Sequence, residues 1–349
     1  MNTLPASAYT DPAVYEHERS AVFGRQWQLA GFTAALRQPG DFVRHEFAGW
    51  SVVVVVDDDG ALRAFHNVCR HRAGPLVVDD AGRGSSFVCR YHGWAYALDG
   101  SLRAARDFGD DTLDLAAYPL FAVQVAAWRG LVFVNLDPDA PPLLDDHGAF
   151  FAAAADRHLE SLTYSHRVVH SINANWKVYT DNYGEGYHVP LVHPELNREL
   201  VAKEYRVDVG DHFCTHHAPT RSGAVNAGLW LWRYPNLALN IYPDGMNVER
   251  FVPDGPRRTL VVYDYFFRDL ANSANADVER MGREVLAEDR AICEAVQRNL
   301  EVGVYSAGVL SPRHENGLAA FHEWLAESLQ SSGNSLSSQT SKYQRSPYA

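Results

Sequence analysis

The feature that most constrains how this chain can fold is a pair of short motifs, CRH at positions 69–71 and CRYH at positions 89–92. Each motif combines one cysteine with one histidine and lies in a loop between β-rich runs. Two thiolates and two imidazoles are the ligand set of a [2Fe-2S] centre that has cysteines on one iron and histidines on the other. The cluster ligands predicted in this way are Cys69, His71, Cys89 and His92.

The same four residues could instead bind a structural zinc ion, because a Cys2His2 set also suits tetrahedral Zn(II). Zinc sites more often hold their cysteines in one block and their histidines in another, whereas here each block is mixed. Imidazole ligands raise the reduction potential of an iron–sulfur cluster, so the favoured interpretation is an electron relay. Gly74 and Gly93 beside the motifs would let the backbone approach the cluster sulfurs.

The length of 349 residues suits two domains. From Phe42 to about Asp137, short apolar runs alternate with turn residues, which predicts an antiparallel β domain. The turn-rich segment at 137–142 predicts a boundary. We expect four parts: an N-terminal helical segment at 1–37 that packs on the second domain, a β domain at 38–140, the second domain at 141–330, and a disordered serine-rich tail at 331–349.

The second part of the chain mixes helical and strand patterns. Its expected elements are a helix at 147–161, a strand at 167–175, strands within 229–242 and at 258–267, and a long helix from about 274 to 301. Between 236 and 241, leucine and isoleucine alternate with asparagine and alanine, which predicts a half-buried strand. The predicted fold class is α+β, an N-terminal antiparallel β domain followed by an antiparallel sheet with helices.

Composition excludes several classes of function. A net charge of −12 without a Lys/Arg cluster argues against nucleic-acid binding. The longest strongly apolar run, Val52 to Val56, is too short to cross a membrane, and residues 1–18 lack a basic and an apolar secretion signal. We therefore expect a cytoplasmic protein. Its four scattered cysteines are better explained as thiols or metal ligands than as a disulfide framework.

A second candidate metal site follows the first by about one hundred residues. His188 and His193 are five positions apart, and Glu185 precedes His188 by three, so that on a helix Glu185 and His188 would share one face. Pro190 disfavours helical geometry at Val189, and a further proline at 194 does the same at His193. The chain is therefore expected to turn and to bring the two histidines together.

The helix expected at 274–301 offers a carboxylate for this site. Ile292, Val296 and Leu300 repeat every four residues, and Asp289 stands three before them, so the apolar stripe begins with an acid. A buried charge needs a partner or a metal. His188, His193 and Asp289 would then form a two-histidine, one-carboxylate triad that leaves Fe(II) open positions for O2 and substrate. The neighbouring Glu284, Glu288 and Arg290 are expected on other, solvated faces.

Two stretches resemble a known family. FHNVCRHRAG and CRYHGWAY resemble the Rieske domain of ring-hydroxylating oxygenase α subunits, and NWK...DNYGEGYHVPLVHPEL with EDRAICEAVQRNL resembles their catalytic domain. The resemblance covers roughly residues 5–328. The additional cysteine pair of respiratory Rieske proteins is missing from the sequence, which disfavours that branch.

The resemblance implies roles for the candidate residues. In that family the residues matching His188, His193 and Asp289 bind iron. The acid matching Glu185 hydrogen-bonds a Rieske histidine of the neighbouring subunit, which by position is His92, so electrons cross between the subunits of a ring-shaped homotrimer. A glutamate at this position, where many members have aspartate, resembles the carnitine oxygenases that act on quaternary ammonium compounds, and DNY...GYHVP resembles choline monooxygenases.

The implied reaction is O2-dependent hydroxylation or oxidative demethylation of a small organic molecule, either an aromatic or a quaternary ammonium compound. The sequence shows neither a GxGxxG dinucleotide motif nor a plant-type ferredoxin cysteine run. NAD(P)H electrons must therefore come through a separate flavin or ferredoxin reductase. The alternative from another class is a non-catalytic Rieske electron-transfer protein.

Other side chains carry weaker signals. Four aromatic residues could form a cage for a trimethylammonium group, although packing inside strands is the commoner role of such residues; they are Trp230, Trp232, Tyr234 and Tyr242. Six histidines without motif support are expected to be structural or exposed; they are His66, His166, His170, His212, His216 and His217.

Overall fold

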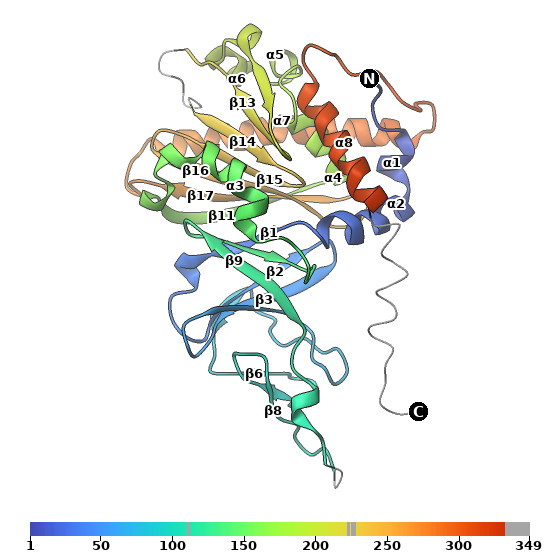
Figure 1. Cartoon of the computed structure of the whole chain (residues 1–349). Coiled ribbons are helices and arrows are strands. Elements are labelled where there is room, and N and C mark those ends of the chain that lie inside the picture. Colours follow the sequence, from blue (N-terminus) through green and yellow to red (C-terminus); the bar gives the residue numbers. More distant parts are fainter. Residues whose placement is uncertain (110–111, 222–223, 225–227, 332–349) are drawn as a thin grey trace. The chain divides into compact units, whose positions relative to one another are not determined.

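The computed structural model describes residues 1–109, 112–221, 224 and 228–331. The chain divides into two compact units, one of Met1–Phe23 with His147–Ala349 and one of Gly24–Asp146. The tail predicted to be disordered lies outside the described residues from position 332 onward. Both units are built on antiparallel sheets, and helices accompany the sheet of the first, which confirms the predicted α+β class (Figure 1).

The unit Gly24–Asp146 is a β domain. Its main sheet has the strand order β1-β10-β9-β4-β3-β2-β5, and a small sheet has the order β6-β7-β8. The CRH motif follows β4, and the CRYH motif lies in the hairpin between β6 and β7. The strands are β1 (Gln28–Phe32), β2 (Asp41–Phe47), β3 (Trp50–Val56), β4 (Leu62–His66), β5 (Ala81–Arg83), β6 (Phe87–Val88), β7 (Ala95–Tyr96), β8 (Leu102–Ala104), β9 (Ala122–Trp128) and β10 (Leu131–Asn135), with short 3-10 turns η2 (Thr33–Ala35) and η3 (Leu115–Ala117).

The other unit holds a seven-stranded antiparallel sheet in the order β11-β17-β16-β15-β14-β13-β12. Its strands are β11 (Thr163–Ile172), β12 (Arg206–Val209), β13 (Phe213–His217), β14 (Leu229–Arg233), β15 (Leu237–Ile241), β16 (Gly245–Pro253) and β17 (Thr259–Phe267). The sequence-based strand at 167–175 therefore begins and ends earlier than predicted, and the segment 229–242 forms a hairpin of two strands.

Helices pack against this sheet. The longest, α7 (Asn275–Glu301), packs against α4 (Trp176–Tyr183), and α4 packs on β16. The helix predicted at 147–161 is shorter, because α3 gives way to two 3-10 turns. The remaining helical elements are α1 (Ala6–Thr10), α2 (Pro12–Glu18), η1 (Arg19–Phe23), α3 (Leu143–Ala153), η4 (Ala155–Arg157), η5 (Leu159–Ser161), α5 (Val189–Val192), α6 (Pro194–Glu199), η6 (Ala202–Glu204) and α8 (Asn316–Ser331).

Strand β15 differs from its prediction in a way that matters for the site. All five of its residues are buried, so the expectation of a half-buried strand is wrong. The strand register explains this, because Asn240 stands in a row across the sheet with Trp230 on β14 and Asn247 on β16. These residues border a cavity beneath the helices, so the polar face of β15 is covered and not solvated.

The buried face of α7 also differs from its prediction. Asp289 and Leu300 are buried as expected, but the buried positions between them are Cys293 and Gln297, at intervals of four from Asp289. Ile292 and Val296 are 39% and 40% exposed, so they do not lie in the buried stripe. The apolar pattern was offset by one position from the face that packs, because Cys293 and Gln297 carry no strong hydrophobic signal.

A fully buried ion pair joins the N-terminal segment to α4. The Lys177 ammonium lies 2.7 Å from the Glu18 carboxylate, and both side chains are 0% exposed. The Trp176 indole N–H donates to the same carboxylate at 2.9 Å. Burial lowers the pKa of Lys177, and the charge of Glu18 partly offsets that effect. This pair fixes the start of the helix that leads into the candidate metal site.

In the parts of the chain that the structure describes, none of the helices combines the length and the apolar character needed to cross a membrane.

Removal of the buried carboxylate should destabilise the protein far more than removal of an exposed one. Glu18→Ala leaves Lys177 buried without a counter-charge and should lower the free energy of unfolding by about 3–5 kcal/mol. Glu16→Ala, which breaks the exposed pair of Glu16 with Arg19 at 2.7 Å, is the matched control and should change it by less than about 1 kcal/mol. Denaturant titration of the three proteins measures both effects, and equal effects would contradict this assignment.

Candidate functional site

The segment after α4 places the two histidines of the candidate metal centre. The N-cap of helix α4 is Asn175, whose side chain accepts a hydrogen bond from the Lys177 backbone N–H, and its C-cap is Gly184. The chain then turns through Glu185 to His188, which precedes α5, and His193 stands between α5 and α6. The histidines thus lie at the ends of a single short helix, which brings their side chains together.

Of the two predicted effects of proline on this turn, the structure shows one. His193 has non-helical backbone angles before a proline, as expected. Val189 is helical, however, so the expectation that Pro190 would exclude it from a helix is wrong. Pro190 stands in the first turn of α5, where its missing N–H has no partner to lose and its fixed φ suits the helix.

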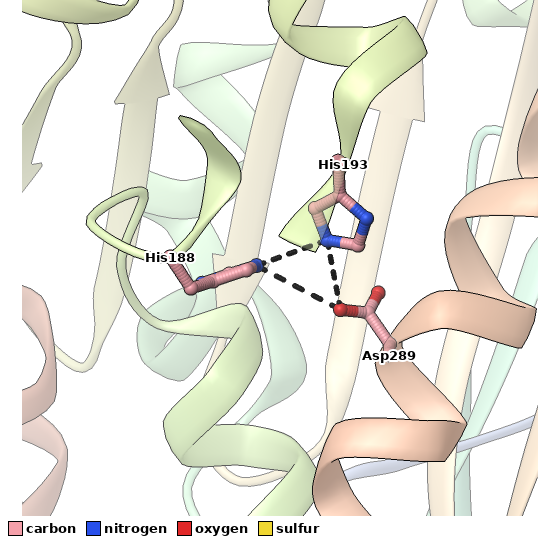
Figure 2. A group of neighbouring side chains, drawn as sticks. All are labelled: His188, His193 and Asp289. Carbon is pink, nitrogen blue, oxygen red and sulfur yellow. Dashed lines mark hydrogen bonds and ion pairs between the residues drawn. The ribbon is translucent and has the colours of Figure 1, made fainter. Parts of the chain in front are cut away.

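Three donor atoms converge at the candidate metal centre formed by His188, His193 and Asp289 (Figure 2). His188 Nε2 lies 3.1 Å from His193 Nε2, and the Asp289 Oδ1 atom lies 3.7 Å from the first nitrogen and 2.9 Å from the second. The histidines come from the turns around α5 and the carboxylate from α7. The structure therefore brings together the two histidines and the helix acid that the sequence singled out.

Two further carboxylates accept hydrogen bonds from the Nδ1 atoms of the two imidazole rings, on the side away from the metal position. The His188 Nδ1–H donates to Glu185 Oε1 at 2.5 Å, and the His193 Nδ1–H donates to Glu288 Oε2 at 2.7 Å. Because a carboxylate only accepts, each bond places the ring proton on Nδ1 and leaves a lone pair on Nε2. Glu288 was expected on a solvated face of the helix, and its contact with His193 corrects that expectation.

The geometry fits a metal ion. Two Nε2 lone pairs that face each other across 3.1 Å repel unless a cation lies between them. Donor atoms about 3 Å apart suit adjacent ligands at right angles around a metal at about 2.1 Å, because the ligands are then separated by about 1.4 bond lengths. Carboxylates that orient metal-binding histidines through Nδ1 are typical of such centres. Two histidines and one carboxylate, with other positions open, suit Fe(II).

Asp289 and His193 are further constrained by their neighbours. The Asn182 side-chain amide donates to Asp289 Oδ1 at 2.6 Å, which fixes the carboxylate orientation. Burial lowers the pKa of His193, but the hydrogen bonds and charges of Asp289 and Glu288 outweigh burial, so that its pKa is raised. The site therefore favours positive charge at the point where the three donor atoms meet.

A cavity of about 120 Å³ adjoins this centre. Its lining includes the three candidate metal ligands and Glu185, together with residues of β13 to β17. The aromatic residues of the lining are Tyr179, Tyr183, Tyr205, Trp230, Tyr242 and Tyr263. This arrangement can hold a small molecule against the metal position behind a largely aromatic wall.

Of the four aromatic residues proposed for a cage, the structure places two in the cavity. Trp230 and Tyr242 line it. Trp232 and Tyr234 are buried elsewhere and pack against Phe321 at ring-centroid distances of 5.6 Å and 6.2 Å. These two therefore have the packing role that was noted as the commoner one.

Sequence reasoning missed several residues of the cavity. His216, expected to be structural or exposed, lines the cavity with its Nδ1 atom 2.6 Å from the Tyr205 hydroxyl. Burial lowers the pKa of His216 to about 4, so the ring is neutral near pH 7. Glu249 also lines the cavity, and it had no motif around it. Only the strand register brings these residues together, and one sequence does not reveal that register.

The candidate cluster site lies in the β domain, on two loops that contain the same kind of backbone hydrogen bond. The Cys69 backbone N–H donates to the Gly74 carbonyl at 2.8 Å, and the Cys89 N–H donates to the Trp94 carbonyl at 2.9 Å. Both thiols are buried and free, whereas His71 and His92 are exposed, with ring centroids 4.5 Å apart. The four predicted ligands thus lie on two adjoining loops, with the histidines on the outside.

The surroundings of the thiols fit a cluster. A Cβ atom on Gly74 would lie 2.9 Å from the Cys89 sulfur, so this position leaves room only for glycine beside the sulfur. The Tyr96 hydroxyl lies 3.3 Å from the Cys69 sulfur and offers it a hydrogen bond. Close backbone and hydroxyl contacts to the sulfurs stabilise the negative charge of an iron–sulfur cluster.

Comparisons with known proteins give matches over both units. Residues 26–119 match the family described as Rieske [2Fe-2S] domain, and residues 159–225 and 215–331 match the ring hydroxylating alpha subunit (catalytic domain). The chloroplastic choline monooxygenase of Amaranthus tricolor is 31% identical over 344 residues, which cover 94% of this chain and 78% of that protein. The carnitine monooxygenase oxygenase subunit of Escherichia coli (strain K12) is 30% identical, with 93% of each chain covered.

A solved structure is similar as well. A quaternary ammonium Rieske monooxygenase, described for carnitine oxidation and inter-subunit electron transfer, superposes with a TM-score of 0.85 at 28% identity. The match covers 94% of this chain and 96% of that one. The similarity therefore extends over both candidate centres.

Loss of the carboxylate behind His193 should weaken metal binding without disturbing the cluster. Glu288→Ala removes the acceptor for the Nδ1 proton and should lower Fe(II) affinity about 10- to 100-fold. Glu288→Gln, whose amide oxygen can still accept this proton, should lose less. Iron titration of protein with an intact cluster measures the effect.

Glu284→Ala is the matched control, because it removes an acid one turn earlier on α7 that pairs with Arg280 outside the cavity. Its Fe(II) affinity should equal that of the unaltered protein. Equal affinity in Glu288→Ala would show that Glu288 does not orient His193.

Proposed function

This chain belongs to the family of Rieske-type ring-hydroxylating oxygenase α subunits, and from that premise we propose which reaction it catalyses and how its electrons arrive. It is an iron-dependent oxygenase that uses a [2Fe-2S] cluster, a mononuclear iron ion and O2. The proposed reaction is hydroxylation or oxidative demethylation of a small organic molecule. The observation that carries it is the convergence of His188, His193 and Asp289 beside a cavity.

We assign the cluster to Cys69, His71, Cys89 and His92, and the iron to His188, His193 and Asp289. When bound, the cluster stores one electron and the iron activates O2 with the electrons it receives. The protein's own contribution is positional. Glu185 and Glu288 hold the Nδ1 protons of the two histidines, Asn182 orients Asp289, and the aromatic wall keeps water from the reacting carbon.

Glu185 is proposed as the bridge by which electrons cross between subunits. Its Oε1 atom bonds His188, and the residue borders a second, larger hollow of about 710 Å³. That hollow is lined by half-exposed or exposed apolar side chains, among them Ile292, Val296 and Val304. Such a surface suits contact with a second copy of the chain, whose exposed His92 would reach Glu185, as in a homotrimer.

A separate flavin or ferredoxin reductase is proposed as the donor of NAD(P)H electrons. It would dock on the β domain, which carries the predicted cluster ligands, outside the hollow around His71 and His92 that contact with a neighbouring subunit would cover.

The substrate is proposed to be a quaternary ammonium or an aromatic compound. The similarity to proteins named choline and carnitine monooxygenases supports the first. A panel of betaines, carnitine, choline and aromatic acids, supplied with a reductase and scored for formaldehyde, aldehyde or hydroxylated product, tests both. No product and no O2 uptake with any of them would favour a non-catalytic electron carrier, which would hold about two irons per chain where the oxygenase holds about three.

The bridging role of Glu185 has a separate test. Glu185→Ala, reconstituted with excess Fe(II), should keep both metal centres loaded and lose coupled turnover about 100-fold or more, because the path from the cluster is interrupted. Metal analysis, the cluster resonance at low temperature and O2-coupled product formation are measured on the same sample. Glu185→Gln separates the two roles of the residue, since it still accepts the His188 proton but carries no charge. Normal coupled activity in Glu185→Ala would refute the bridge.

A further inference from the structure

A carboxylate that neither metal centre uses lies in the wall of the cavity. Glu249 stands on β16, and its side chain is 3% exposed. Its Oε1 atom accepts a hydrogen bond from the Tyr179 hydroxyl at 2.8 Å, and its Oε2 atom accepts one from the Asn240 amide at 3.0 Å. The Asn240 carbonyl oxygen accepts in turn from the Tyr183 hydroxyl at 2.7 Å. Glu249 is therefore held rigidly by neutral donors.

Two other buried carboxylates of this unit, Glu18 and Asp264, are paired with a lysine or an arginine. Glu18 lies 2.7 Å from Lys177, and Asp264 lies 2.6 Å from Arg250. No Lys or Arg occurs among the described residues that line the cavity around Glu249. A buried carboxylate with only neutral partners is unfavourable, and a fold retains one where a ligand supplies the opposite charge.

The pKa of Glu249 also indicates a buried carboxylate that has no cationic partner. Burial raises its pKa to about 7, and the hydrogen bonds from Tyr179 and Asn240 offset only part of that effect. A cation in the cavity would stabilise the ionised carboxylate.

The rest of the wall suits the same kind of ligand. Six aromatic side chains line the cavity, and their ring faces attract cations. The Asn247 side-chain oxygen lies in the same lining, on the same face of β16 as Glu249, and is a buried acceptor without a hydrogen-bond partner in the described chain. The cavity volume of about 120 Å³ leaves room for a compact group.

We propose that Glu249 is a specificity-determining residue that selects a compact cation, such as a methylated ammonium group, and holds it beside the iron position. This inference rests on the proposed oxygenase function and chooses between its two substrate classes. The ionised Glu249 would repel the carboxylate of an aromatic acid from the same space. An uncharged ligand would leave the charge of Glu249 without a partner.

The test compares a cation with its uncharged analogue of the same shape. Choline and 3,3-dimethylbutan-1-ol differ in one atom, nitrogen against carbon, and with it in charge. Binding of each to the iron-loaded protein is measured by anaerobic calorimetry, with tetramethylammonium as a further cation. We expect at least one of the cations to bind about tenfold or more tightly than the neutral alcohol.

Glu249→Gln keeps the size of the side chain and an acceptor for the Tyr179 hydroxyl, but removes the charge. In this variant the preference for the cation should fall to about threefold or less, with cluster and iron contents unchanged. Glu284→Gln removes one charge from α7 outside the cavity and should keep the full preference. A preference that Glu249→Gln leaves intact would overturn the proposal.

Binding measurements on the unaltered protein also test the proposal, so the test does not depend on whether a variant folds. Binding of the neutral alcohol as tightly as the cations, or binding of none of the cations, would overturn it. If an uncharged aromatic compound supports coupled O2 uptake and the cations do not, the oxygenase function stands and the role of Glu249 fails. If protein with an intact cluster binds no mononuclear iron, the oxygenase function fails first.

Discussion

The arrangement of the active site depends on two carboxylate–imidazole hydrogen bonds, Glu185 to His188 and Glu288 to His193. Each bond places the ring proton on Nδ1, so that the two Nε2 lone pairs meet beside the Asp289 carboxylate. The two lone pairs repel each other, and a cation bound between them makes this arrangement favourable. The short helix between the histidines, the turn after α4 and the buried face of α7 all serve to hold these groups at that point.

The sheet contributes the other wall of the site, and its chemistry is unusual for a sheet interior. A row of side chains crosses four strands as His216, Trp230, Asn240 and Asn247, and Glu249 follows on the same face of β16. Residues of α4 and α7 line the same cavity and cover this polar face of the sheet, and within it the Asn240 amide donates a hydrogen bond to Glu249. A wall rich in hydrogen-bond acceptors and aromatic faces, next to a metal position, links the fold directly to the kind of molecule the enzyme can accept.

Much of the chemistry could be predicted from local sequence. The mixed Cys/His motifs, the two histidines five positions apart and Asp289 lie in compact segments whose residue types alone restrict the ligand. Glu288 escaped prediction because helix periodicity placed it on a solvated face, and the loop that carries His193 reaches it there. Asn240, Glu249 and His216 escaped because their proximity arises from strand register and from the helices that cover the sheet, and neither is a local property. The apolar stripe of α7 gave a wrong prediction of the buried face, because Ile292 and Val296 border an open hollow and not the core.

The central claim is that one polypeptide holds a histidine-ligated cluster and, separately, an iron ion with open coordination positions. Electron paramagnetic resonance of the reduced, iron-loaded protein exposed to one equivalent of nitric oxide tests it most directly, because nitric oxide binds to an Fe(II) ion that has a free coordination position. The account predicts a high-spin iron–nitrosyl signal that disappears in His193→Ala, while the resonance of the reduced cluster persists in both proteins. An intact cluster resonance without any nitrosyl signal in the unaltered protein would contradict it.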